Sequence, residues 1–289
     1  MRRLIWLAAS AAPVTALAHG EANAHHWWSF DPWVWVPMAA VSLLYLRGIS
    51  ALRARRSLPY PARLPAMLCF ATAMAATFFA LIWPLDVLGA SSLAAHMAQH
   101  MLLIAVAAPL FAIAEPAAPL LVGMPGTARI VPLIKTIGRV MRPLLRPGVA
   151  FGVHGALVWL WHAPLLFELA LRWRWVHVLE HIAFLGSALL FWSALQQARR
   201  AGGEGYGVAA LWTLATLMHT GLLGALLTFS PRLLYAFYAG LDHAPLAPME
   251  DQQLAGLLMW IPGGLCYLAA GVYFASTWLR DAERRGKRA

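Results

Sequence analysis

The sequence has few charged residues and almost no cysteine. Of its 289 residues, 12% are charged and 61% are hydrophobic, whereas an average soluble domain has about 25% charged and about 45–50% apolar residues. These values exclude a disordered chain, a coiled coil and an ordinary cytosolic enzyme. The two cysteines, Cys69 and Cys266, lie far apart in apolar runs, which favours buried free thiols over a disulfide, a redox pair or a metal pair.

Several motifs of soluble enzymes are also missing. The sequence contains neither the GxxxxGK[ST] phosphate-binding loop nor the GxGxxG dinucleotide motif. No serine lies in a GxSxG nucleophile elbow. These absences argue against nucleotide-dependent and serine-hydrolase chemistry.

The N-terminus has the order of a secretory signal. Two arginines precede a short apolar run that ends in Ala-Leu-Ala, as in the charged start, apolar core and cleavage site of signal peptides. We expect residues 1–18 to be a cleaved signal peptide; the alternative is an uncleaved extra helix. Residues 19–32 then form a histidine-rich periplasmic segment. If cleavage leaves His19 first, its amine and ring nitrogen can chelate one metal ion.

Seven apolar segments follow, and a membrane-spanning helix needs about 20 mostly apolar residues. We predict an all-α integral membrane protein with a single bundle of seven helices over residues 33–279, followed by a basic cytoplasmic tail over 280–289. The predicted spans are Trp33–Leu46, Pro65–Pro84, Leu93–Ile113, Val149–Leu169, Val176–Gln196, Val208–Phe229 and Leu254–Leu279.

Most of the cations lie in alternate loops between these spans. Three loops and the tail, all on one side, carry 17 of the 22 Lys and Arg residues, and the other side carries three. Because cytoplasmic loops are enriched in Lys and Arg, we predict an outside N-terminus and a cytoplasmic C-terminus. The spread over four segments argues against nucleic-acid binding. The inner loop Ala114–Gly148 has room for an interfacial helix near Ile130–Met141.

Two pairs of histidines have the spacing of metal ligands on a helix. His96 and His100 lie at the outer end of the third span, and His177 and His181 at the outer end of the fifth. Four residues advance a helix by about 6 Å and turn it by about 40°, so both imidazoles of a pair face one way. Ionisable residues in spans generally face the bundle interior. We predict that the two pairs form one metal site; the alternative is hydrogen bonding between helices.

Further candidates lie near the same depth or below it. His162, near the outer end of the fourth span, is a candidate fifth ligand. Imidazole suits copper, zinc or iron, and a thioether suits Cu(I), while carboxylates attract the cation or orient the imidazoles. Haem stays an option because two histidines lie deeper in the bundle. The candidates for secondary metal binding, or for contacts to the ligands, are Asp86, Met97, Met101, Glu180, His154, His219, Asp251 and His19.

Six short stretches carry a resemblance to a known family. They are His96–Met101, Ala108–Leu110, Trp161–Leu165, His177–Phe184, Phe191–Trp192 and Asp251–Gly264. In this order and topology they resemble the CtaG-type cytochrome c oxidase assembly factors of bacterial membranes, over roughly Pro32–Trp278. The resemblance implies a seven-helix membrane protein that helps to form active haem-copper oxidase by handling copper, without catalytic turnover of its own.

We therefore expect an assembly factor in the bacterial cytoplasmic membrane that is not an enzyme. It would bind copper at a periplasm-facing histidine cluster and deliver it to cytochrome c oxidase subunits, with a periplasmic copper carrier as a further candidate partner. Three alternatives stay open: a transporter that moves copper through the membrane along His154 and His219, a haem or di-metal redox protein, and a scaffold whose histidines only join helices.

Overall fold

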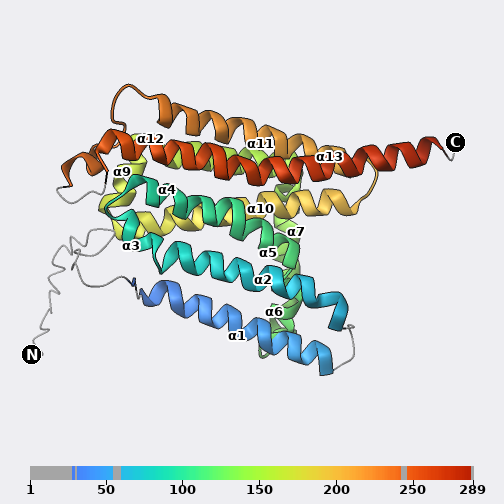
Figure 1. Cartoon of the computed structure of the whole chain (residues 1–289). Helices are drawn as coiled ribbons and strands as arrows, with labels where there is room; N and C mark the ends of the chain where they lie inside the picture. The colour runs from blue at the N-terminus through green and yellow to red at the C-terminus, as the bar shows by residue number, and fades with distance from the viewer. Residues whose placement is uncertain (1–27, 30, 55–59, 242–245, 288–289) are drawn as a thin grey trace, which may run out of the picture.

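The computed structural model describes residues 28–29, 31–54, 60–241 and 246–287. Within these ranges every regular element is a helix and no strand occurs. The long helices lie side by side in one bundle (Figure 1). The predicted all-α class is therefore confirmed for the described part of the chain, whereas the predicted signal peptide and His19 lie outside it.

Four helices each correspond to one predicted span. The first begins near the predicted start but continues beyond Leu46 to Ala54. Arg47 and Arg53, which were predicted to lie in a loop, therefore lie in the helix. The other three match the predicted spans to within a few residues at most ends. These helices are α1 (Pro32–Ala54), α2 (Tyr60–Leu81), α10 (Arg174–Arg200) and α11 (Glu204–Phe229).

Two further spans contain a π-helical segment. The third span is α4 (Leu93–Met101), η1 (Leu102–Ala107) and α5 (Ala108–Ala114), and the last is α12 (Pro248–Leu258), η4 (Met259–Gly263) and α13 (Gly264–Gly286). Pro109 follows the first π-helix and Pro262 lies in the second. A proline has no N–H to donate to the carbonyl four residues earlier, so the regular hydrogen-bond ladder cannot continue there.

The fourth predicted span, Val149–Leu169, is not one continuous helix. It is split into α8 (Pro147–Trp161) and α9 (Pro164–Arg172). Pro164 disfavours helical geometry at the residue before it, and Ala163 is extended. The 15 residues of α8 are about 22 Å long, so this span is shorter than the roughly 30 Å hydrocarbon core of a bilayer.

The number of membrane crossings follows from length and apolarity. Six helical stretches in the described residues are long and apolar enough to cross a membrane, and a bent pair formed by Val131–Leu145 and Pro147–Trp161 raises the number to seven. The chain is a multi-pass membrane protein with six or seven crossings, and the predicted seven is the upper value.

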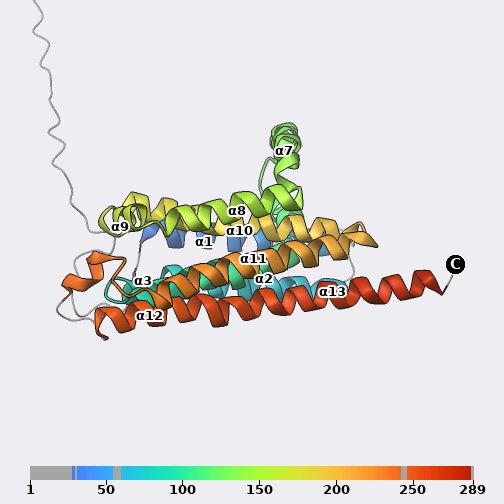
Figure 2. The same ribbon diagram turned by 90° about the horizontal axis from the view of Figure 1, so that it is seen from above.

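Shorter helices connect the spans. An α-helix is present where an interfacial one is expected near Ile130–Met141, and its axis differs in direction from α8 by 83° across the intervening turn. Figure 2 shows it projecting from the bundle. The short elements are α3 (Leu85–Gly89), α6 (Ala117–Gly123), α7 (Thr127–Met141), η2 (Arg142–Leu145) and η3 (Ala236–Gly240).

The direction of the spans alternates along the chain. Helices α1, α4, α10 and α12 begin at the end of the bundle near α9, and α13 ends at the opposite end (Figure 1). Basic residues in the last turns of α1, α10 and α13 therefore gather at the end where the cation-rich segments were predicted. Which membrane face this is stays a prediction.

Helices α11 and α12 approach closely at two glycines. A Cβ atom on Gly256 would overlap the hydroxyl of Thr228 and the carbonyl oxygen of Gly224, and a Cβ on Gly224 would come within 2.8 Å of the carbonyl oxygen of Gly256. Small residues at such contacts allow membrane helices to pack backbone to backbone. This packing fixes the start of the last span beside α11.

We expect Gly256→Ala to destabilise the protein, because overpacking a close contact typically costs about 1–3 kcal/mol. Gly186→Ala is the matched control, since a Cβ at this helical glycine meets no atom within 4 Å. Thermal unfolding of the purified proteins in detergent checks this. A melting temperature lowered equally by both substitutions, or by neither, would contradict the close packing of α11 on α12.

Candidate metal centre

The two histidine pairs meet inside the bundle. The ring centroids of His96 and His100 on α4 are 4.5 Å apart, and those of His177 and His181 on α10 are 4.2 Å apart. Between the helices, the ring centroids of His96 and His177 are 5.2 Å apart, and those of His100 and His181 are 5.4 Å apart. The helical spacing alone thus accounts for each pair, and the packing of the helices brings the pairs together.

Four buried side chains can offer ligand atoms to one point. One donor atom each from His96, His177, Glu180 and His181 lies within 4.8 Å of the other three. We call these four residues the donor group. His100, which we expected among the main ligands, lies beside this group, with its Nε2 atom 3.9 Å from Glu180 Oε2. Glu180 therefore occupies a more central position than the histidine pattern predicted.

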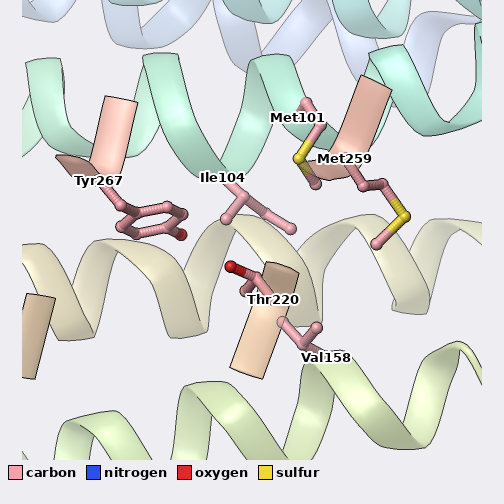
Figure 3. Close-up of a pocket in the computed structure, with 6 residues that line it drawn as sticks. All are labelled: Met101, Ile104, Val158, Thr220, Met259 and Tyr267. Atoms are coloured by element: carbon pink, nitrogen blue, oxygen red, sulfur yellow. The ribbon is translucent and has the colours of Figure 1, made fainter. Parts of the chain in front are cut away.

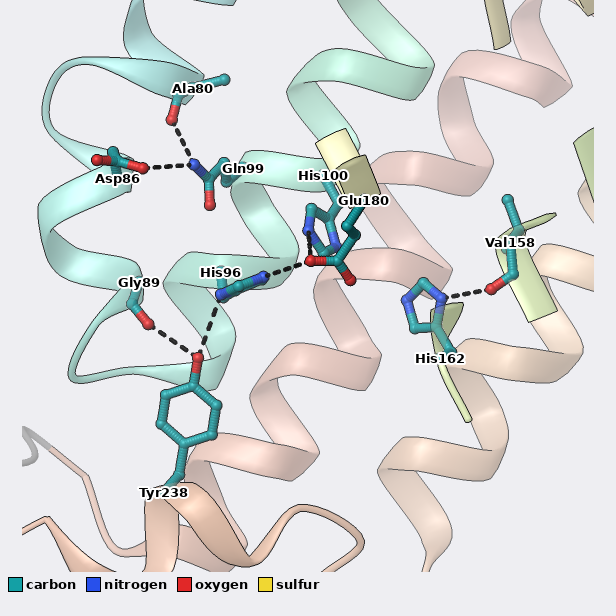
Figure 4. A network of polar contacts seen from close by, with 10 residues as sticks. All are labelled: Ala80, Asp86, Gly89, His96, Gln99, His100, Val158, His162, Glu180 and Tyr238. Carbon is teal, nitrogen blue, oxygen red and sulfur yellow. Dashed lines mark hydrogen bonds and ion pairs between the residues drawn. The ribbon is translucent and has the colours of Figure 1, made fainter. Parts of the chain in front are cut away.

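Glu180 is fully buried without a hydrogen bond. Its side chain has 0% exposure, and neither carboxylate oxygen has a hydrogen-bond partner in the described part of the chain. The His96 Nε2 atom lies 3.8 Å from Glu180 Oε2, so imidazoles surround the carboxylate at ion-pair distance (Figure 4). A charged carboxylate in such a place requires a compensating positive charge.

Buried aromatic side chains pack against the histidines of α4. The ring of Phe167 on α9 lies 5.1 Å from that of His96, and the ring of Phe184 on α10 lies 4.6 Å from that of His100. Both phenylalanines are fully buried. Electrostatic interactions are stronger in such apolar surroundings than in water, so the charge state of the donor group matters for the stability of this end of the bundle.

His162 adjoins the donor group at the break between α8 and α9. Its Nδ1–H donates to the carbonyl oxygen of Val158 at 2.7 Å, and its ring centroid lies 6.1 Å from that of His100. A neutral imidazole that donates through Nδ1 has its lone pair on Nε2, and this atom is buried without a hydrogen-bond partner among the described residues. His162 can therefore accept a proton or bind a metal at Nε2.

Tyr238, from the loop between α11 and α12, sets the tautomer of His96. Its hydroxyl donates to the carbonyl oxygen of Gly89 at 2.8 Å and lies 3.2 Å from His96 Nδ1 (Figure 4). Because the hydroxyl proton is used on Gly89, the phenol oxygen accepts from His96 Nδ1–H, and the His96 lone pair is on Nε2. No sequence signal singles out Tyr238, which lies 142 positions from its partner.

Burial keeps the Tyr238 hydroxyl protonated. Burial raises the pKa of Tyr238 well above its ordinary value, and the nearby Glu180 and Asp251 carboxylates raise it further. The pKa of Tyr235 is raised as well, first by burial and then by Glu180. Both hydroxyls therefore remain donors at physiological pH.

The same loop covers the donor group. Tyr235 donates from its hydroxyl to the carbonyl oxygen of His162 at 2.9 Å. The backbone N–H of Ala236 donates to Glu168 Oε1 at 2.9 Å, and that of Leu234 donates to Gln252 Oε1 at 2.7 Å. Side-chain hydrogen bonds thus fasten this loop, residues 230–241, over the site.

Asp251 caps α4. Its carboxylate accepts from the hydroxyl of Ser92 at 2.7 Å and from the backbone N–H groups of Leu93 and Ala94 at 2.5 and 3.1 Å. These groups include two of the N–H groups that a helix start leaves without an intrahelical partner. Asp251 was predicted to attract the cation or orient the imidazoles, and in the structure it joins α12 to the start of α4, the helix that carries His96 and His100.

Gln99 links Asp86 to α4, the helix that carries His96 and His100. The amide nitrogen of Gln99 donates to Asp86 Oδ1 at 3.2 Å and to the carbonyl oxygen of Ala80 at 2.9 Å. This ties α3 and the end of α2 to the face of α4 that adjoins the histidine pair (Figure 4).

The two candidate methionines are not in the donor group. Met97 is fully buried in the hydrophobic core. Met101 lines a small, mostly apolar cavity (Figure 3). The other residues that line this cavity are Ile104, Val158, Thr220, Met259 and Tyr267.

The two deeper histidines also lie outside the donor group. His154 on α8 is buried, and its Nδ1 atom lies 3.0 Å from the hydroxyl of Ser187 on α10. His219 on α11 is half-buried, and its ring lies 5.5 Å from that of Phe151. Each packs against neighbouring helices, and they form a separate polar region of the bundle.

Comparison with known proteins places the chain in a family. A model described as cytochrome c oxidase caa3 assembly factor matches residues 43–281, a range that contains the donor group, His100, His162 and Tyr238. No curated protein and no solved structure is similar enough to match the chain. The match covers most of the sequence and confirms the resemblance drawn from its motifs: the chain belongs to the cytochrome c oxidase caa3 assembly factor family.

Proposed function

We propose that this assembly factor carries copper as its cargo in the donor group and delivers it to cytochrome c oxidase without catalysing a reaction. The observation that supports this most is the burial of Glu180 among three histidines. Family membership supplies the role in oxidase assembly, and the donor group supplies the site at which a metal would be held.

The buried carboxylate favours a bound cation. Taking an ionised carboxylate out of water costs on the order of several kcal/mol, which only a close positive charge or several hydrogen bonds can offset. Glu180 has no hydrogen bond in the described residues. A metal ion held by the histidine nitrogens would place positive charge against Glu180 and occupy ring nitrogens that face it. Protonation of the carboxylate or of a neighbouring imidazole is the competing way to remove the charge.

The donor types suit copper. Three imidazoles with an adjoining fourth and fifth suit copper, zinc or iron, and among divalent ions copper binds nitrogen and oxygen sites most tightly. The family assembles a haem-copper enzyme, which makes copper the relevant cargo. Cu(I) needs only two or three nitrogens, so His100 and His162 would be free to receive the ion during loading and release.

The position of the site fits delivery at one membrane face. The donor group lies near the starts of α4 and α10, at the end of the bundle opposite the cation-rich last turns of α1, α10 and α13. Since cations mark the cytoplasmic side, we infer that the site faces the periplasm of a bacterial cytoplasmic membrane. Oxidase subunits would receive the copper there, and a periplasmic copper carrier would supply it.

Copper binding should depend on the α10 pair. We expect His177→Ala/His181→Ala to weaken copper binding by more than about 100-fold, because loss of outer hydrogen-bond partners alone costs about 10–100-fold. Glu180→Gln, which keeps the shape of the side chain, should weaken it as well. His219→Ala is the control, since His219 lies outside the donor group. Titration of the purified, metal-free protein with copper checks this, and unchanged affinity in the double variant would refute the site.

Oxidase assembly should fall with copper binding. In cells that depend on this chain, His177→Ala/His181→Ala should lower the copper content and the activity of the oxidase, and His219→Ala should leave both near wild type. Both variants are compared at equal protein level in the membrane. If the double variant loses copper binding while the oxidase keeps its copper content and activity, the metal site is supported but its role in delivery is contradicted.

Tyr238 should tune the site through His96. We expect Tyr238→Phe to weaken copper binding by about 10–100-fold, the usual effect of removing a partner that orients a ligating histidine. Tyr235→Phe is matched in chemistry and position, but the Tyr235 hydroxyl donates to a backbone carbonyl oxygen, that of His162, and not to an imidazole ring, so its effect should be small. Equal effects of the two substitutions on copper affinity would contradict a role of Tyr238 in setting the His96 tautomer. They would indicate instead that either substitution loosens the loop.

A further inference from the structure

Helix α7 is set at a large angle to the bundle. The segment Val131–Leu145 and the helix Pro147–Trp161 differ in direction by 83°, and Figure 2 shows α7 standing out from the bundle beside α8. The start of α7 is fixed by Thr127, whose hydroxyl lies 2.5 Å from the carbonyl oxygens of Leu121 and Met124. Since α8 runs with the spanning helices, an element nearly perpendicular to it lies along the membrane plane.

One face of α7 is apolar and uncovered. Leu133, Ile137, Val140 and Met141 are exposed to 59%, 51%, 69% and 38%. Their spacing of four, three and one residues places them on one side of a helix. Residues this apolar and this exposed are typical of a surface that meets lipid or another protein.

The opposite face is cationic. Lys135 and Arg139 of α7, and Arg142 directly after it, follow one another at intervals of four and three residues, about half a turn from the apolar residues. All three are exposed, and none takes part in an ion pair within the described part of the chain. No acidic residue occurs between Glu115 and Glu168, so nothing nearby in the sequence neutralises this charge.

We propose that α7 lies on the surface of the bilayer that the chain spans and binds anionic phospholipid headgroups. The exposed apolar residues would enter the boundary between headgroups and acyl chains, and the cationic face would lie at the headgroup layer. An apolar face opposite a Lys- and Arg-rich face is the pattern of helices that lie in the interface plane, and basic segments beside spans are attracted to anionic lipid. This inference does not rest on the copper site.

The test uses the full chain with a fluorescent label on α7. Cys69 and Cys266 are replaced by alanine, and Val140→Cys carries an environment-sensitive fluorophore. The protein is placed in nanodiscs of phosphatidylcholine alone or with phosphatidylglycerol. We expect stronger quenching by lipids that carry a shallow quencher than by lipids with a deep one, and a shift of the emission to shorter wavelength when phosphatidylglycerol is present.

Charge variants test whether the cations of α7 themselves bind the anionic headgroups. Lys135→Gln/Arg139→Gln/Arg142→Gln should abolish the effect of phosphatidylglycerol. The control Arg284→Gln/Arg285→Gln/Lys287→Gln removes the same charge at the end of α13 and should retain the effect. An effect of phosphatidylglycerol that survives the α7 substitutions overturns the proposal.

Three other results also overturn it. A label in water in every nanodisc means that α7 does not contact lipid, and quenching from the bilayer centre makes α7 part of a broken span. Burial of the label only when oxidase subunits are added assigns the face to a protein partner. Hydrogen exchange of residues 133–141 in the unmodified chain, which should slow with phosphatidylglycerol, keeps the proposal testable if a labelled variant does not fold.

Discussion

The carboxylate of Glu180, buried among imidazoles and without a hydrogen bond to any described residue, is the constraint on which this end of the bundle depends. Helix α10 places Glu180 between His177 and His181, and α4 brings His96 and His100 to within ion-pair or ring contact of the same point. A charged group in an apolar interior must be compensated. A bound cation is one way to meet this requirement, and it supports the proposed copper cargo more directly than the number of histidines does.

A second buried carboxylate holds two spans together beside the donor group. Asp251 accepts three hydrogen bonds from the start of α4 and so joins the last span to the third. Together with contacts made by Gln99 and Tyr238, these bonds hold α4 in place. In this position the Nε2 atom of His96 is directed at Glu180. A rigid α4 with fixed imidazoles meets the need of a metal site for ligands that are oriented before the ion arrives.

Local patterns in the sequence predict most of this arrangement. Apolar length placed the third span at Leu93–Ile113, within one residue of its observed end, and the four-residue spacing predicted that each histidine pair shares a helix face. Such local patterns do not predict the contacts between segments that lie far apart in the sequence. The packing of the spans decides that Glu180 lies at the centre, that Asp251 caps α4 and that Tyr238 contacts His96. The break between α8 and α9 depends on Pro164, because apolarity alone predicts one continuous helix there.

X-ray absorption spectroscopy at the copper edge, on the copper-loaded protein, tests the central claim most directly. We expect one copper ion per chain with two to four nitrogen or oxygen neighbours and the outer-shell scattering of histidine rings. Glu180→Gln should change that spectrum, and His219→Ala should leave it unaltered. A spectrum dominated by sulfur neighbours, or one without imidazole scattering, would show that the histidine and glutamate group of α4 and α10 does not hold the metal.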